Sequence, residues 1–460
     1  MPTLQPKGVD PLKQFREGAW ALVRGDEQTV PLISTAFAVK IRGGIAAVTS
    51  VRTFRNQESQ DIEPTMTFPV PIDAVLCSLK ARIDGRELVA VAAPKDEARE
   101  TYEMAIDSGG SAVLHEELIK GVHMLSVGRV APGADVIVTS TFVVPLSFAG
   151  DRPGLRIPTT VGEIFGRSPL LDSDDLAVSD HEHRASVTIA CDNGKATLLG
   201  SKANGAGVFE VSLDAPIDIA VSGWTPQELK GRAGDGREVR LRVSPLEMSS
   251  ADLDVDLLFD RSCSMNDRAD GDAEVRQSKF EVAKSGLRAY AEGRVGAKDR
   301  VRVWEFNGSV NFVGEAVGSA VTALVQKLQT PSGGTEIGVA LDALRAREAA
   351  RNVVLVTDGK SWAFDPQKYA RCGMRVTAVL IGEDALEGGV SHLAGLTGGQ
   401  VFVPLGSDVP AAIAVAMDAA RLSFASVRAS HRRPEKLAVI RRGARIEVEL
   451  RGKPRQGKAL

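Results

Sequence analysis

The chain has 460 residues, of which 43% are hydrophobic and 25% are charged, and its formal net charge is −3. That length predicts two or three domains, and the near balance of charge argues against a nucleic-acid-binding protein and against an acidic, solvating chain. The four cysteines form no CxxC pair, which argues against a zinc ribbon or a dense disulfide framework.

The first residues, MPTLQPKGVDPLKQF, show no apolar segment typical of a secretory signal, and we expect residues 1–30 to be a loosely structured lead-in. The sequence has no run of about 18 apolar residues, so we expect no membrane span. These patterns predict a cytoplasmic location in a reducing compartment.

From residue 31 the pattern is that of β-strands. TAFAVKIRGGIAAVTSVRTFRN predicts a hairpin around Gly43-Gly44, and Asp84-Gly85 marks a second turn. APKDEARETYEMAIDSGG then predicts a helix, because apolar residues recur every four positions between a proline and a glycine. Residues 150–185 are expected to be a loop, and the short alternating strands that follow predict an antiparallel β-sandwich.

Near residue 252 the pattern changes to strands that alternate with amphipathic helices. The strands DLDVDLLFD, NVVLVTDG and RVTAVLIG are apolar without alternation, which is typical of a parallel sheet covered on both faces. In such doubly wound α/β sheets, binding sites form beyond the carboxyl ends of the strands.

Three segments that follow strands of this half, or begin its helices, carry oxygen-bearing side chains. They supply five candidate ligands, which are Asp260, Ser262, Ser264, Thr335 and Asp358. Two carboxylates and three hydroxyls suit a hard cation such as Mg²⁺, and the lack of histidine in these segments argues against Zn²⁺. The two-residue spacing lets both serines face one point while Arg261 and Cys263 face away.

A nucleophilic serine or Cys263 is the alternative for the same stretch. A serine nucleophile needs a base within hydrogen-bond reach, and none of the six histidines falls in these segments. We therefore expect a binding protein without catalytic residues. A hydrolase or redox enzyme that uses the metal or the Cys263 thiol, and a scaffold with a silent site, are kept as alternatives.

The segments DRSCSM, SGGTE and VTDG resemble the von Willebrand factor A domain with its metal-ion-dependent adhesion site. The resemblance implies that Asp260, Ser262, Ser264, Thr335 and Asp358 bind Mg²⁺, with Mn²⁺ or Ca²⁺ possible in its place. It implies an open coordination position for a Glu or Asp carboxylate of a protein partner, and a sheet order of 3-2-1-4-5-6. Cys263 stands where the family commonly has glycine.

The β half has a resemblance of its own. VRTFRN, FPVP, KDEARETYEMA, SVGRVAPG and DIAVSGW resemble the VIT domain of inter-alpha-trypsin inhibitor heavy chains, in particular of their intracellular and bacterial relatives. The two resemblances imply a VIT-like domain over 31–165, a β-strand extension or connector over 166–250 and an A domain over 251–425.

The segment 421–460 is basic, with 12 Lys and Arg residues against 3 acids. A basic tail can bind nucleic acid or another anionic partner, and this tail is the only hint of such a partner. Ile446, Val448 and Leu450, however, alternate with glutamates, which is a strand pattern. We therefore favour a hairpin around Gly443 that makes 426–460 part of the β half.

Overall fold

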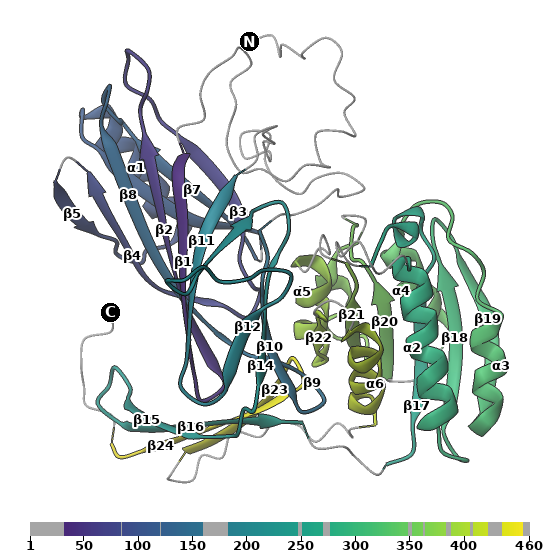
Figure 1. Cartoon of the computed structure of the whole chain (residues 1–460). Coiled ribbons are helices and arrows are strands. Elements are labelled where there is room, and N and C mark those ends of the chain that lie inside the picture. Colours follow the sequence, from purple (N-terminus) through teal and green to yellow (C-terminus); the bar gives the residue numbers. More distant parts are fainter. Residues whose placement is uncertain are drawn as a thin grey trace.

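The structure is a computed structural model with a β half and an α/β half side by side (Figure 1). It describes residues 32–83, 85–119, 121–159, 183–246, 251–269, 277–347, 352–361, 364–382, 388–404, 408–421 and 435–453. The predicted lead-in over 1–30 and the predicted boundary between 165 and 166 lie outside the described residues. Within those residues, no helix is both long and apolar enough to cross a membrane.

The β half is built on a seven-stranded sheet with the order β13-β11-β1-β2-β8-β4-β5. Its strands alternate buried and accessible residues, as a sheet with one face on a core requires. The predicted hairpin is confirmed, because Gly43 and Gly44 both have positive φ between β1 and β2. The bounds are Leu32–Arg42 (β1), Ile45–Arg55 (β2), Val75–Ile83 (β4), Arg86–Val89 (β5), Asp135–Pro145 (β8), Arg184–Cys191 (β11) and Val208–Ser212 (β13).

Two smaller sheets pack with it around one apolar core. They are β3-β7-β6, with bounds Thr65–Pro69, Val122–Gly128 and Ala112–Ile119, and β12-β14-β10-β9, with bounds Lys195–Leu198, Ile217–Ser222, Arg152–Ile157 and Ser147–Ala149. Two expectations were wrong here. Strand β10 lies inside the predicted loop 150–185, and β11 pairs with β1 in parallel, because it returns from a distant segment rather than through a tight turn.

Helix α1 (Lys95–Asp107) confirms the helix predicted in this half. The helix begins after Pro94. The carboxylates of Asp96 and Glu97 in its first turn interact favourably with the positive end of the helix dipole. Tyr102 is its buried residue, and its hydroxyl donates to Glu63 at 2.7 Å.

A histidine pair on the neighbouring strands β6 and β7 should make the β half sensitive to acid. His115 Nε2 lies 3.1 Å from His123 Nδ1, and burial, the neighbouring His123 and then Arg52 lower the pKa of His115 to about 3. An unfolded histidine titrates near 6.5. Between these values the unfolded chain binds a proton that the folded chain does not, so stability present above pH 6.5 is lost as the pH falls.

We expect the free energy of unfolding to fall by about 1.4 kcal/mol per pH unit from His115 alone between pH 6 and pH 4.5. Urea unfolding of the wild type and of His115→Phe across that range measures this loss. The variant should have the shallower pH dependence, whereas His392→Gln, a change on α5, should keep the wild-type slope. Equal slopes for the wild type and His115→Phe would contradict the prediction.

The α/β half is a six-stranded sheet with the order β19-β18-β17-β20-β21-β22, which confirms the predicted order 3-2-1-4-5-6. The order implied by the resemblance includes this third strand, but no residue pattern located it at β19; β19 runs antiparallel to β18, because the turn between them is too short for a crossover. The other four pairings are parallel. The bounds are Asp254–Asp260 (β17), Arg300–Phe306 (β18), Val310–Val317 (β19), Asn352–Thr357 (β20), Arg375–Leu380 (β21) and Val401–Phe402 (β22).

Helices cover both faces of this sheet, as the unbroken apolar strands predicted. α2, α3 and α6 share one buried cluster with the sheet, and α4 and α5 share the other. β17 and β20 are packed between these two clusters, and their carboxyl ends lie at the same edge of the sheet. The bounds are Lys279–Gly293 (α2), Val321–Gln326 (α3), Ile337–Ala346 (α4), Gly388–Thr397 (α5) and Val409–Ala419 (α6).

The predicted C-terminal hairpin forms and returns to the β half (Figure 1). β23 (Glu435–Arg441) and β24 (Ala444–Arg451) turn at Gly443, and β24 pairs along its length with β16 (Glu238–Pro245), beside β15 (Glu228–Arg232). The α/β half is therefore inserted between two neighbouring strands of one sheet. Several basic residues of the segment are paired with glutamates of the same hairpin.

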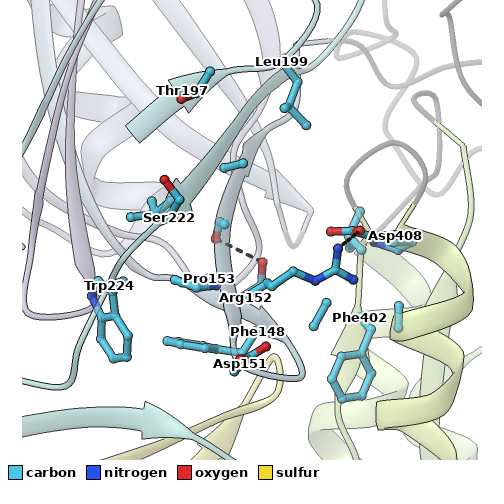
Figure 2. Close-up of a pocket in the computed structure, with 18 of the residues that line it drawn as sticks. Phe148, Asp151, Arg152, Pro153, Thr197, Leu199, Ser222, Trp224, Phe402 and Asp408 are labelled. Atoms are coloured by element: carbon cyan, nitrogen blue, oxygen red, sulfur yellow. Dashed lines mark hydrogen bonds and ion pairs between the residues drawn. The ribbon is translucent and has the colours of Figure 1, made fainter. Parts of the chain in front are cut away.

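A cavity of about 610 Å³ lies where the two halves meet. Figure 2 shows Arg152, beside Pro153 and Phe148 of the β half, reaching across to Asp408, with an ion-pair distance of 2.7 Å. Phe402 of the α/β half also lines the cavity, and much of the wall around the ion pair is apolar. Arg156 makes a second link, because its Nη1 donates to the Gly382 carbonyl at 3.1 Å.

Candidate metal centre

The two candidate aspartates lie at the carboxyl ends of adjacent parallel strands. Asp260 is the last residue of β17, and Asp358 follows the last residue of β20. Phe259 pairs with Val356 in the ladder between them, so the two strands end at the same level. Both carboxylates are fully buried.

The backbone after Asp260 turns so that both serines lie together. The Ser262 amide donates to Asp260 Oδ1 at 2.8 Å, and the Ser262 and Ser264 hydroxyl oxygens lie 3.1 Å apart. Residues Cys263–Asn266 form a right-handed 3₁₀ turn, and Cys263 is exposed. Cys263 is not in the left-handed region, so replacing the common glycine by cysteine costs no backbone strain here.

Thr335 comes to the same edge on the loop before α4. Two backbone hydrogen bonds join this loop to the Asp260 turn, from Cys263 N to Gly333 O at 2.9 Å and from Ser332 N to Arg261 O at 2.6 Å. Thr335 is only 3% exposed, and its hydroxyl has no hydrogen-bond partner among the described residues. A buried polar atom without a partner is costly, and a bound cation would satisfy it.

The electrostatics of the edge also suit a cation. Burial, followed by the neighbouring carboxylate of Asp358, raises the pKa of Asp260 to about 7, against the hydrogen bonds from Thr357 and Ser262 that favour its ionised form. Thr357 Oγ1 lies 2.5 Å from Asp260 Oδ2. A divalent cation between two such carboxylates would remove their repulsion.

One charged residue of the site was not predicted. Lys279 is 1% exposed, and its Nζ lies 3.1 Å from Asp358 Oδ2. A capping box between Ser278 and Glu281 starts α2 and fixes Lys279 as its first residue. The sequence placed it on an amphipathic helix, and no local pattern indicated that its ammonium group points inward to Asp358.

The structure brings the five candidate residues to one edge of the sheet and adds Lys279 to them. The hydrogen bond described for the hydroxyls of Ser262 and Ser264 joins these two residues to each other and involves no histidine. In the described part of the chain, no three His, Cys, Asp or Glu side chains converge as ligands. The donor set is therefore made mainly of hydroxyls, with two carboxylates, and it fits a hard cation better than Zn²⁺.

Residues 32–142 match the family model of the VIT domain, described as the vault protein inter-alpha-trypsin domain. Von Willebrand factor A domain-containing protein 5A of Rattus norvegicus is 34% identical over 137 residues, which are 29% of this chain and 17% of that protein. Protein mono-ADP-ribosyltransferase PARP4 of Mus musculus is 30% identical over 241 residues, which are 52% of this chain and 11% of that protein.

Among solved structures, a von Willebrand factor type A protein from Catenulispora acidiphila is 17% identical, with a TM-score of 0.32, and the match covers 50% of this chain and 66% of that one. The matches span less than a fifth of the length of the two curated relatives. The VIT match covers most of the first part of the β half, and the sheet order 3-2-1-4-5-6 of the α/β half is the order that its resemblance to a von Willebrand factor A domain implied. The chain is therefore similar to proteins that combine a VIT domain with a von Willebrand factor A domain.

Proposed function

We propose that this protein is a metal-ion-dependent interaction module, which binds an acidic residue of a protein partner through Mg²⁺. The observation that carries the proposal is the buried Thr335 hydroxyl, which lacks a partner at the edge where two buried carboxylates and two serines meet. A fold that only kept these residues for packing would be expected to satisfy that hydroxyl.

The hydroxyls of Ser262, Ser264 and Thr335 and the carboxylates of Asp260 and Asp358 would hold the cation. When bound, the cation supplies a Lewis-acid position that can accept one further oxygen ligand. α4 begins just after Thr335, and the positive end of its dipole favours an anionic group at this place. A Glu or Asp carboxylate of a partner meets both requirements.

Lys279 explains why the two buried carboxylates do not destabilise the fold before a cation binds. Its ammonium group balances one of the two buried carboxylates, so the metal-free fold does not carry two uncompensated negative charges. Mg²⁺ therefore competes with a cation that the chain itself provides. We expect the affinity for Mg²⁺ to be moderate for that reason.

Isothermal titration of the full chain with Mg²⁺ tests metal binding. Thr335→Val removes the hydroxyl and keeps the shape, so we expect the wild type to bind one Mg²⁺ and the variant to bind at least about tenfold more weakly, which corresponds to about 1.4 kcal/mol. Thr322→Val on α3 is the matched control and should bind as the wild type does. Absence of divalent-cation binding by the wild type would overturn the metal-dependent function and favour a structural scaffold with a silent site.

Partner capture tests the second part of the proposal. Bait protein in Mg²⁺ should retain partners that EDTA releases, and Thr335→Val bait should not retain them. Changing the partner's contacting Glu or Asp to Gln or Asn should abolish capture. Partners that stay bound equally in Mg²⁺ and EDTA would show that recognition does not pass through the metal.

A further inference from the structure

A second charged site lies inside the β half, far along the chain from the metal-binding residues. Arg52 is on β2, in the row of residues that points into the core, and it is 5% exposed. Thr35 lies directly opposite on β1, in the same register. Residues in such pairs have their side chains on the same face of the sheet.

The Arg52 guanidinium group has few partners for a buried charge. Its Nη1 donates to Ser50 Oγ at 2.9 Å, and its Cζ lies 4.1 Å from the centre of the Phe68 ring. Within the part of the chain that the structure describes, its buried Nε has no hydrogen-bond partner and no carboxylate forms an ion pair with it. Burial lowers the pKa of Arg52 to about 10, so the group stays charged at neutral pH.

Arg52 lines a small cavity of about 20 Å³, which has room for one water molecule or one small ion. Thr35 lines it too, and the buried Thr35 hydroxyl also has no hydrogen-bond partner among the residues that the structure describes. The rest of the wall is largely apolar, with Met66, Phe68, Phe142, Ile157 and Leu213 among its residues. Two hydrogen-bond donors without partners among the described residues, Arg52 Nε and the Thr35 hydroxyl, therefore belong to residues that line one cavity. Its other walls are largely apolar and cannot solvate the charge of Arg52.

We propose that this cavity is a binding site for one small monovalent anion, either chloride or a single carboxylate group, held by Arg52 and Thr35. A water molecule would satisfy the donors but would leave the buried positive charge without a counter-charge. Phosphate and sulfate are too large for the cavity. The site would stabilise the VIT part of the chain, and it does not depend on metal binding at Thr335.

Thermal unfolding of the full chain in EDTA tests the proposal. Sodium gluconate is replaced stepwise by sodium chloride, and in a second series by sodium formate, at constant ionic strength. We expect either small anion to raise the wild-type midpoint by about 2–4 °C when its concentration is about tenfold above its Kd, and to keep raising it with the logarithm of the concentration. Arg52→Met should lose the response, Thr35→Val should weaken it, and the exposed Arg82→Met on β4 should keep it.

A response to chloride alone assigns the site to a halide, and a response to formate alone assigns it to a carboxylate group. A bromide-soaked crystal of the wild type gives a second measurement, which needs no variant to fold. It should show an anomalous peak within about 3.5 Å of Arg52 Nε. A wild-type midpoint that is equal in gluconate, chloride and formate, or bromide only at the surface, would overturn the proposal.

Discussion

Asp358→Ala should abolish Mg²⁺ binding and lower the free energy of unfolding of the metal-free protein by about 3–5 kcal/mol. The variant loses a carboxylate that we propose as a ligand, and it removes the counter-charge that now lies 3.1 Å from the buried Lys279 ammonium group. Breaking one side of a buried ion pair is costly because the remaining charge has been taken out of water. Titration calorimetry and urea unfolding in EDTA measure the two effects.

Lys279→Met separates the two effects. Alone, it should raise the affinity for Mg²⁺ by about tenfold or more, because the competing cation is gone while all five proposed ligands remain. Combined with Asp358→Ala, it should restore most of the lost stability without restoring Mg²⁺ binding. An unchanged or weaker affinity in Lys279→Met would mean that Lys279 does not compete with the metal.

The sequence was sufficient to predict that the candidate ligands share one edge of the sheet, because most of the pattern is local. Asp260, Ser262 and Ser264 lie within five residues, and Asp358 follows an apolar run that can only be a buried strand. Parallel pairing then brings both strand ends together. Lys279 could not be predicted in the same way, because its role depends on where α2 packs and not on the pattern of α2 itself.

The same distinction applies to the β half. The sequence predicted β1 and β2 as a hairpin, but an arginine in the second strand gave no sign that it would be buried without a carboxylate partner among the described residues. That absence is a property of the neighbouring strands β1, β3 and β8. Likewise, β19 was missed because a short turn after β18 leaves no local sign of a reversed strand.

The C-terminal hairpin was predicted as strands, but its partner β16 lies about two hundred residues earlier in the chain, and a local pattern does not identify such a pairing. Ala444 is fully buried and Ile446 is 9% exposed, and both belong to the core of the β half. β24 also covers the backbone edge of β16 over eight residue pairs. The hairpin should therefore be essential to the β half rather than an appendage.

A chain that stops at residue 425 should keep a folded α/β half and lose a stably folded β half. Its β16 edge would be unpaired and its core would be open where Ala444 and Ile446 now pack, which favours unfolding and aggregation. Limited proteolysis should leave a protected fragment near 251–421 and degrade the β half.

Restoring the missing segment, and a milder change in the full chain, complete the test. Adding residues 426–460 as a separate peptide should restore protection of the β half, because the pairing with β16 does not require an unbroken chain. The full-length double variant Arg445→Ala/Glu447→Ala removes only an exposed ion pair of the hairpin and should cost less than about 1 kcal/mol. Equal protection of the β half with and without the hairpin would contradict the prediction. It would mean that the core of the β half forms without residues 426–460, and that β24 only adds an edge strand to it.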